Sequence, residues 1–350
     1  MHIRIRKILV RATNWIGDSI MSLPALEQLK KAFPEAHICV LLRSWVKPVY
    51  EAHPSVDQIT IYDKKDGLKR IYQLTKIIKR LRKEDFDIAV LFQNAFEAGL
   101  IGFFSGARMR VGLDSDMRRL FLTHPVKKKK QHHIKNYLDI VKALGVKTEE
   151  KPPLLYLKES YTIEADKVLK GLGIDENQLL VGFSPGAAYG PAKRWPADSF
   201  AQIAKRAIKS WNAKILLFGS KKETSICQKI QQKVEDVIDL SGKLDLGTTM
   251  GVIKRCDIFL SNDSGLMHIA SALGIPTIGI FGSTDPELTG PKGICSYSIK
   301  SSISCSPCFK RECPKNLECL YSISPDQVWK KMEEIRDEAC SILRQRRNNK

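Results

Sequence analysis

Residues 256–284 read CDIFLSNDSGLMHIASALGIPTIGIFGST, where short apolar runs flank a polar turn and an amphipathic segment. The run at 258–260 is typical of a buried parallel strand. The turn includes Ser264, a candidate N-cap for a helix with one apolar face. A Gly and a Pro end that helix, and residues 277–281 form the next expected strand. The segment predicts a βαβ unit whose helix N-terminus lies at the carboxyl edge of a parallel sheet, where α/β proteins bind ligands and an anion is favoured.

The rest of the chain repeats this alternation, which predicts an α/β protein. The other expected strands lie at residues 7–12, 38–42, 59–62, 87–92, 110–113, 179–183, 214–218 and 237–240, and the first strand of the quoted segment spans 257–260. We expect the strand at 110–113 to lie at a sheet edge.

Lys151 and two prolines interrupt the pattern and form the predicted linker. We therefore expect one domain over residues 1–150 and a second over 151–325. A final helix over 326–350 should follow Ser324, which is an N-cap candidate.

The 350-residue chain has the composition of a soluble globular protein, with 43% hydrophobic and 27% charged residues. It contains no apolar run of transmembrane length and no signal-peptide pattern, so we expect a cytoplasmic protein. The net charge of +19 favours nucleic acid, an anionic membrane surface or phosphorylated substrates as partners. The chain lacks a nucleic-acid-binding motif and interleaved basic and aromatic residues, so nucleic-acid binding is the weaker alternative.

The first βα turn, RATNWIGDS at residues 11–19, holds a candidate general base. Its single Gly excludes a dinucleotide fingerprint, and the chain contains no GxxxxGK[ST] loop. Asp18 lies where the first helix starts, as either a capping residue or a base. A helix N-terminus lowers the pKa of an Asp and desolvation raises it, so the turn alone leaves both interpretations open.

A second turn, SPGAAYGPAKRWP from Ser184 onward, is a candidate phosphate loop. Ser184 and Gly186 let backbone N–H groups approach a phosphate, and Lys193 and Arg194 can neutralise a diphosphate. The alternative is an ordinary βα turn with solvated charges. Glu223 follows the next strand, where it either accepts ribose hydroxyls or simply suits a first helical turn.

Asp263 and Ser264 are expected at the same sheet edge, with His268 one helical turn later. A lone helical His is more often structural, so His268 is a site candidate only through these neighbours.

Two patterns suggest metal ligands. Asp114-Ser115-Asp116 spells the D-x-D of metal-dependent sugar-nucleotide enzymes, although no second ligand set accompanies it. Four cysteines in a Pro-containing loop could bind Zn²⁺ or an iron–sulfur cluster, but a second C-x-x-C is missing, so reduced thiols are the alternative. They are Cys305, Cys308, Cys313 and Cys319.

Three segments together resemble glycosyltransferase family 9, the ADP-heptose:lipopolysaccharide heptosyltransferases. They are NWIGDSIMSLPAL, PGAAYGPAKRWP and SNDSGLMHIASALGIPTIGIFGSTDP, in that order. The resemblance implies a GT-B fold, in which two Rossmann-like domains face one another across a deep cleft. The donor would bind the C-terminal domain and the acceptor the N-terminal one, and the last helix would cross back to the first domain.

The resemblance also implies roles for the candidate residues. Asp18 would be the base, Lys193 would bind the ADP phosphates and Glu223 would lie near the ribose. The remaining residues around the donor would be Ser184, Gly186, Asp263, Ser264, Gly265 and His268.

The implied reaction is an inverting, metal-independent transfer of L-glycero-D-manno-heptose from ADP-heptose to the first heptose of the lipopolysaccharide inner core. The GPAKRWP form most resembles the heptosyltransferase II subfamily, with I and III as alternatives. The acceptor, a heptosylated Kdo–lipid A, implies a peripheral enzyme on the inner face of the inner membrane, in transient contact with an anionic surface. Cofactors would not be required, apart from a possible structural metal in the cysteine loop.

Overall fold

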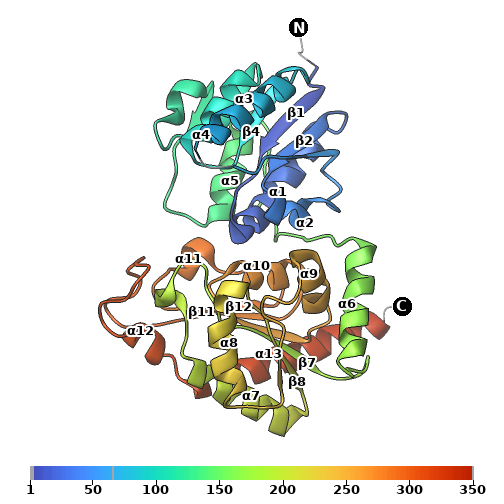
Figure 1. The fold of residues 1–350 in the computed structure, drawn as a ribbon, viewed down its shortest axis with the longest axis vertical. Helices are drawn as coiled ribbons and strands as arrows, with labels where there is room; N and C mark the ends of the chain where they lie inside the picture. Colours follow the sequence, from blue (N-terminus) through green and yellow to red (C-terminus); the bar gives the residue numbers. More distant parts are fainter. Residues whose placement is uncertain (1–3, 65–66, 349–350) are drawn as a thin grey trace. The chain divides into compact units, whose positions relative to one another are not determined.

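The computed structural model describes residues 4–64 and 67–348, and the chain divides into two compact units between Tyr156 and Leu157. Each unit consists of one six-stranded parallel sheet with helices around it (Figure 1). The predicted α/β class is therefore confirmed. Within the described residues, no helix combines the length and apolar character needed to cross a bilayer.

The sheet of the first unit has the strand order β3-β2-β1-β4-β5-β6. Its strands are β1 (Lys7–Arg11), β2 (His37–Leu42), β3 (Gln58–Ile61), β4 (Ile88–Leu91), β5 (Met109–Leu113) and β6 (His124–Val126). Its helices are α1 (Ile16–Ala32), α2 (Lys47–Tyr50), α3 (Leu68–Arg82), α4 (Phe96–Phe104) and α5 (His133–Lys142), with 3-10 turns η1 (Ser44–Val46) and η2 (Arg118–Phe121). Strands β1, β2 and β4 are apolar on both faces because helices cover both sides of the sheet.

The expectation of an edge strand at 110–113 is wrong. Strand β5 pairs with β4 on one side and with β6 on the other. The sequence signal for β6 is weak because the strand has three residues, His124–Val126. Its central Pro125 cannot donate a ladder hydrogen bond and therefore suits the edge position that β6 occupies.

The second unit repeats the same order, as β9-β8-β7-β10-β11-β12. Its strands are β7 (Leu180–Ser184), β8 (Lys214–Leu217), β9 (Val237–Asp239), β10 (Ile258–Asn262), β11 (Thr277–Phe281) and β12 (Ser296–Lys300). Its helices are α6 (Glu159–Gly171), α7 (Ala197–Trp211), α8 (Thr224–Gln231), α9 (Leu246–Lys254), α10 (Gly265–Ala272), α11 (Pro286–Thr289), α12 (Glu318–Tyr321) and α13 (Pro325–Asn348), with 3-10 turns η3 (Pro191–Lys193) and η4 (Lys221–Glu223). The βαβ unit predicted at 256–284 is β10–α10–β11, and β10 lies at the centre of this sheet.

Helix α13 begins as predicted, because the Ser324 hydroxyl accepts a hydrogen bond from the Gln327 N–H at 3.2 Å. Val328 and Met332 are buried in the core of the second unit. Trp329 stacks on Trp211 of α7 with ring centroids 4.4 Å apart. The described beginning of the helix is thus anchored in the second unit, and its crossing to the first domain stays a prediction. Residues 349–350 of the predicted helix lie outside the described residues.

Candidate active site

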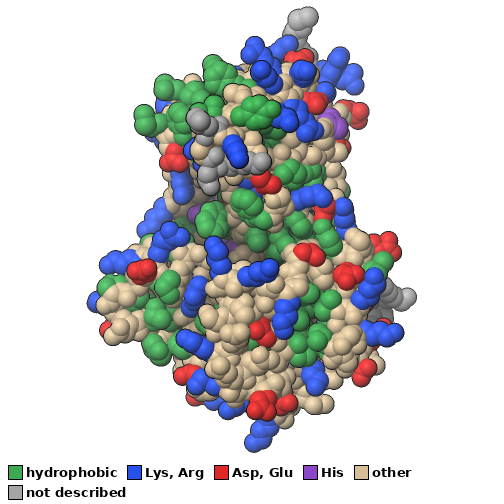
Figure 2. All heavy atoms as spheres, viewed as in Figure 1, with side chains coloured by type: hydrophobic (Ala, Val, Ile, Leu, Met, Phe, Trp, Pro, Cys, Tyr) green, Lys and Arg blue, Asp and Glu red, His purple; other side chains and the backbone are tan. Residues whose placement is uncertain are grey.

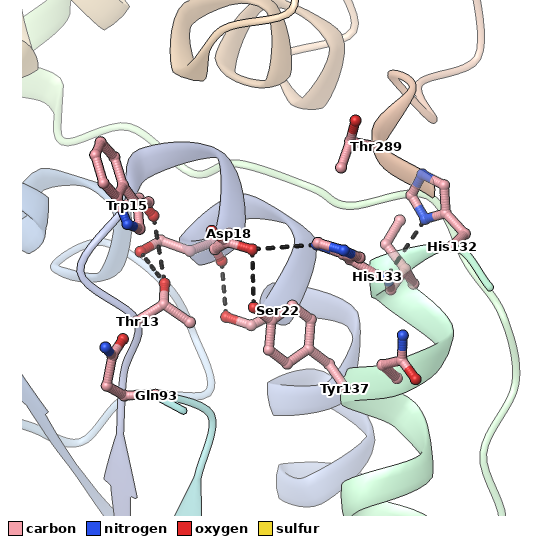
Figure 3. Close-up of polar contacts among 12 residues, drawn as sticks. Thr13, Trp15, Asp18, Ser22, Gln93, His132, His133, Tyr137 and Thr289 are labelled. Atoms are coloured by element: carbon pink, nitrogen blue, oxygen red, sulfur yellow. Dashed lines mark hydrogen bonds and ion pairs between the residues drawn. The ribbon is translucent and has the colours of Figure 1, made fainter. Parts of the chain in front are cut away.

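Two side chains of helix α5 contact the Asp18 carboxylate. Asp18 lies in the first turn of α1, where Trp15 is the N-cap and makes no side-chain cap bond. Its Oδ1 accepts a hydrogen bond from the Tyr137 hydroxyl at 3.0 Å and lies 3.4 Å from Nδ1 of His133 (Figure 3). His133 and Tyr137 are four residues apart in α5, so their side chains share one face, and that helix packs on α1.

The two partners of Asp18 differ in burial. Burial, followed by the adjacent Asp18 charge, raises the pKa of Tyr137 well above its usual value. Tyr137 therefore remains a protonated donor to the carboxylate at any physiological pH. The side chains of Asp18 and His133 are each 29% exposed, so a substrate hydroxyl can reach this carboxylate from solvent.

The backbone before α1 is fixed by polar contacts at the carboxyl edge of the sheet. The Thr13 hydroxyl lies 2.9 Å from that of Ser19, and the Asn14 N–H donates to Oε1 of Gln93 at 3.1 Å. Arg11 donates to the Asn14 side-chain oxygen at 3.0 Å. Burial, and secondarily the nearby Arg43, lowers the pKa of Arg11 to about 10. This hydrogen-bond network orients the turn that carries Asp18.

His133 and Tyr137 were missed by sequence reasoning. His133 follows a run of lysines at residues 127–130, and Tyr137 follows the pattern of a core residue on an amphipathic helix, so neither residue signals a site. They are 115 and 119 residues from Asp18 in the chain. The parallel topology alone places α5 beside α1.

In the second unit, Lys193 and Asp263 form a buried ion pair. Lys193 Nζ lies 2.5 Å from Asp263 Oδ2, and the two side chains are 12% and 6% exposed. The same oxygen accepts a hydrogen bond from the Thr284 hydroxyl at 2.7 Å. Nζ also lies 4.8 Å from the ring centroid of Tyr189. Such a pair positions the ammonium group, since removing one member would leave a buried charge unpaired.

The predicted N-cap of α10 is confirmed. The Ser264 hydroxyl accepts from the Met267 N–H, and it lies 3.0 Å from the Ser261 hydroxyl and 3.5 Å from that of Ser184. Ser184 and Ser261 are register partners at the ends of neighbouring strands β7 and β10. The structure therefore brings the second and third sequence motifs together at the carboxyl edge of one sheet.

Asn262 connects the same two motifs and was also missed. Its amide donates to the Pro185 carbonyl at 2.7 Å and accepts from the Trp195 N–H at 3.0 Å. Asn262 thereby fixes both ends of the loop that carries Lys193.

Glu223 lies directly against the loop glycine. Its Oε2 accepts from the N–H and hydroxyl of Ser220, at 2.8 and 2.7 Å, within a capping box. A Cβ on Gly186 would lie 2.3 Å from Glu223 Oε1, so a larger residue at this position would displace the Glu223 side chain. Glu223 thus lies in the first turn of η4, and its contact with a ribose stays a prediction. His268 is 5% exposed in α10, and its role also stays a prediction.

The four cysteines of the loop lie near one another: burial, followed by the neighbouring Cys305, Cys313 and Cys308, raises the pKa of Cys319. Among the residues that the structure describes, no group of three or more His, Cys, Asp or Glu is placed to hold a metal ion. Cys319 is buried, and the other three cysteines of the loop are half-buried. Cys313 accepts hydrogen bonds from the Leu317 and Lys315 N–H groups at 3.3 and 3.4 Å. Asp114 pairs with Arg119 at 2.7 Å, which accounts for one acid of the D-x-D.

Comparison with known proteins agrees with this arrangement. Residues 74–318 match the family model of glycosyltransferase family 9 (heptosyltransferase). Lipooligosaccharide heptosyltransferase 2 of Haemophilus ducreyi is 32% identical over 300 residues, which cover 81% of this chain and 86% of that protein.

Two solved structures share both halves of the fold. The family 9 glycosyltransferase from Veillonella parvula superposes with a TM-score of 0.87 at 26% identity, covering 97% of this chain and 99% of that one. The E. coli ADP-heptose LPS heptosyltransferase II superposes with a TM-score of 0.80 at 25% identity, covering 95% and 99%. The paired Rossmann-like domains of the GT-B heptosyltransferases are therefore confirmed. With the family model matched across both units, the chain belongs to glycosyltransferase family 9, the heptosyltransferases.

Proposed function

We propose that this glycosyltransferase is a heptosyltransferase II. It transfers L-glycero-D-manno-heptose, with inversion, from ADP-heptose to the first heptose of the lipopolysaccharide inner core. The similarity to heptosyltransferase 2 of H. ducreyi supports the subfamily, and the name of the E. coli neighbour supports ADP-heptose as donor. The observation that carries the mechanism is the Asp18 carboxylate, held by Tyr137 and open to solvent.

In this mechanism Asp18 takes the proton of the acceptor hydroxyl. The hydroxyl oxygen forms a bond to the anomeric carbon of the donor while the bond from that carbon to the diphosphate breaks, and ADP leaves with the electron pair. Tyr137 cannot compete as the base because its phenol stays protonated. It keeps Oδ1 in one orientation, which is how a positioned base gains its advantage.

The leaving diphosphate requires compensation of its developing negative charge. Lys193 supplies a cation that Asp263 holds in place, and Thr284 in turn donates a hydrogen bond to the Asp263 carboxylate. The N-terminus of α10, capped by Ser264, supplies backbone N–H groups with the same polarity. Each preorganised contact of this kind contributes about 3 kcal/mol to transition-state stabilisation. These groups take the part that Mg²⁺ plays in other sugar-nucleotide enzymes.

The decisive experiment measures ADP release from ADP-heptose with inner-core acceptors that carry no heptose, one heptose or two heptoses. Heptosyltransferase II requires the monoheptosylated acceptor, whereas turnover on the heptose-free acceptor would assign subfamily I. A requirement for a preexisting second heptose would assign subfamily III. Full activity in EDTA is expected, and loss of activity that Mg²⁺ restores would contradict the metal-independent mechanism.

The cysteine loop has a separate test, because a structural metal there would not enter the reaction. Elemental analysis of the purified protein distinguishes Zn²⁺ or iron at stoichiometric level from four thiols that all react with a thiol reagent. The enzyme is further proposed to act at the inner face of the inner membrane as a peripheral protein, because its acceptor is a lipid.

A further inference from the structure

Helix α4 exposes large apolar side chains to solvent. Its sequence, FEAGLIGFF, contains one charged residue, so both faces of the helix are apolar. Ala98, Ile101 and Gly102 are buried against the sheet. Phe96, Phe103 and Phe104 point outward and are 44%, 43% and 45% exposed. The helix therefore presents apolar side chains both to the sheet and to solvent.

The adjacent η2 segment extends this surface. Phe121 contacts both Phe96 and Phe103, with ring centroids 5.3 and 5.7 Å apart, and so joins η2 to α4. Leu120 of η2 is 82% exposed, and Met117, the residue that precedes η2, is 79% exposed. We call the exposed residues Phe96, Phe103, Phe104, Met117 and Leu120 the aromatic face. Contiguous exposed apolar side chains of this kind mark an interaction site, unlike isolated ones.

Cations lie beside the aromatic face, on helix α3 and at Arg110. The neighbouring helix α3 contains no acidic residue and exposes Lys69, Arg70, Lys76, Lys79, Arg80 and Arg82. Arg70 of α3 bonds Glu97 of α4 at 3.0 Å, and the Arg110 guanidinium lies 5.3 Å from the Phe103 ring centroid. Figure 2 shows hydrophobic side chains gathered over the region of α3 and α4, with Lys and Arg beside them.

We propose that the aromatic face and α3 together dock the enzyme on an anionic lipid bilayer. Phe104 and Leu120 enter the boundary between headgroups and acyl chains, while the α3 cations contact lipid phosphates. A second copy of the chain is the less suitable occupant, because a symmetric contact would oppose the same cations to one another. The inference rests on the proposed function for its purpose, because the acceptor in that function is carried by a lipid.

The test is vesicle sedimentation with the full-length protein and no acceptor present. Phosphatidylcholine vesicles with and without phosphatidylglycerol are compared at low and physiological salt. The variant Phe104→Ser/Leu120→Ser should bind phosphatidylglycerol vesicles about tenfold or more weakly, since two apolar side chains are removed from the contact. The triple variant Lys76→Gln/Lys79→Gln/Arg80→Gln should bind more weakly and lose most of the salt dependence. The control Ile294→Ser/Tyr321→Ser removes apolar side chains that are 70% and 67% exposed in the second unit, and should bind like wild type.

Equal loss of binding in the control, or unchanged binding of Phe104→Ser/Leu120→Ser, would overturn the docking surface. Sedimentation equilibrium in the absence of vesicles separates the alternative occupant: a wild-type dimer that Phe104→Ser/Leu120→Ser converts to a monomer would assign the face to self-association. Vesicle binding without heptose transfer to a water-soluble acceptor would refute the proposed function and retain the docking surface. Phe104→Ser/Leu120→Ser and the triple α3 variant should retain wild-type turnover on the water-soluble acceptor.

Discussion

Replacing Tyr137 with Phe removes the hydroxyl that donates to Asp18 and keeps the ring. The ring packs edge-on against Phe92 with centroids 5.5 Å apart, a contact that Phe preserves. A hydrogen bond to a charged group contributes about 1.5–3 kcal/mol, and the 29% exposure of the carboxylate favours the lower end. A loss of about 1.5 kcal/mol corresponds to a decrease of about tenfold in kcat/KM at neutral pH.

The same substitution should also shift the pH profile of kcat/KM in a definite direction. The Tyr137 hydroxyl stabilises the ionised carboxylate, so its removal raises the pKa of Asp18. Because the base acts when deprotonated, the acid limb of kcat/KM should move to higher pH, by up to about one unit. The assay is coupled ADP release across the pH range. Tyr137→Phe is measured both in the wild-type enzyme and in the Asp18→Asn variant. In that background Tyr137→Phe should change kcat/KM less than twofold, because its effect acts through the carboxylate.

Tyr50→Phe is the matched control. Tyr50 is also buried, and its hydroxyl lies 3.2 Å from the neutral Ser22 hydroxyl rather than contacting a carboxylate. It should leave the acid limb in place. An unmoved acid limb in Tyr137→Phe, or full additivity with Asp18→Asn, would refute the positioning role.

Three further substitutions test other parts of the structure. Asp18→Asn should lower kcat about 10²-fold or more, while the affinity for ADP-heptose, measured by calorimetry, stays nearly unchanged. Near-normal turnover would remove Asp18 from the mechanism. Lys193→Met should lower kcat about 10²-fold through loss of diphosphate stabilisation, and a change confined to KM would mean that Lys193 binds ground state and transition state equally. Trp329→Ala removes the stack on Trp211 and should lower the free energy of unfolding by about 2 kcal/mol in urea titration, with an unchanged midpoint arguing against anchoring of α13 in the second unit.

Local sequence patterns predicted most of the strands and the N-caps. The run at 258–260 became part of β10 because continuous apolar residues suit a strand covered on both faces. Ser264 and Ser324 became N-caps because their hydroxyls satisfy N–H groups within three residues, which is a local requirement. Strands β6 and β12 escaped prediction, since His124–Val126 and Ser296–Lys300 have weak apolar patterns and are edge strands held by a single neighbour.

By itself the sequence determined the α/β class, the order of strands and helices and the family, because these follow from periodicity and from contiguous motifs. It also identified Asp18 and Lys193 as candidates. Only the tertiary structure decided their partners: Tyr137 and His133 for Asp18, and Asp263 for Lys193. Each partner comes from another element, and parallel crossovers bring distant segments to one sheet edge without leaving a local pattern. The same reason applies to the aromatic face: the sequence of α4 is apolar on both sides, and only packing against the sheet determined which side chains stay exposed.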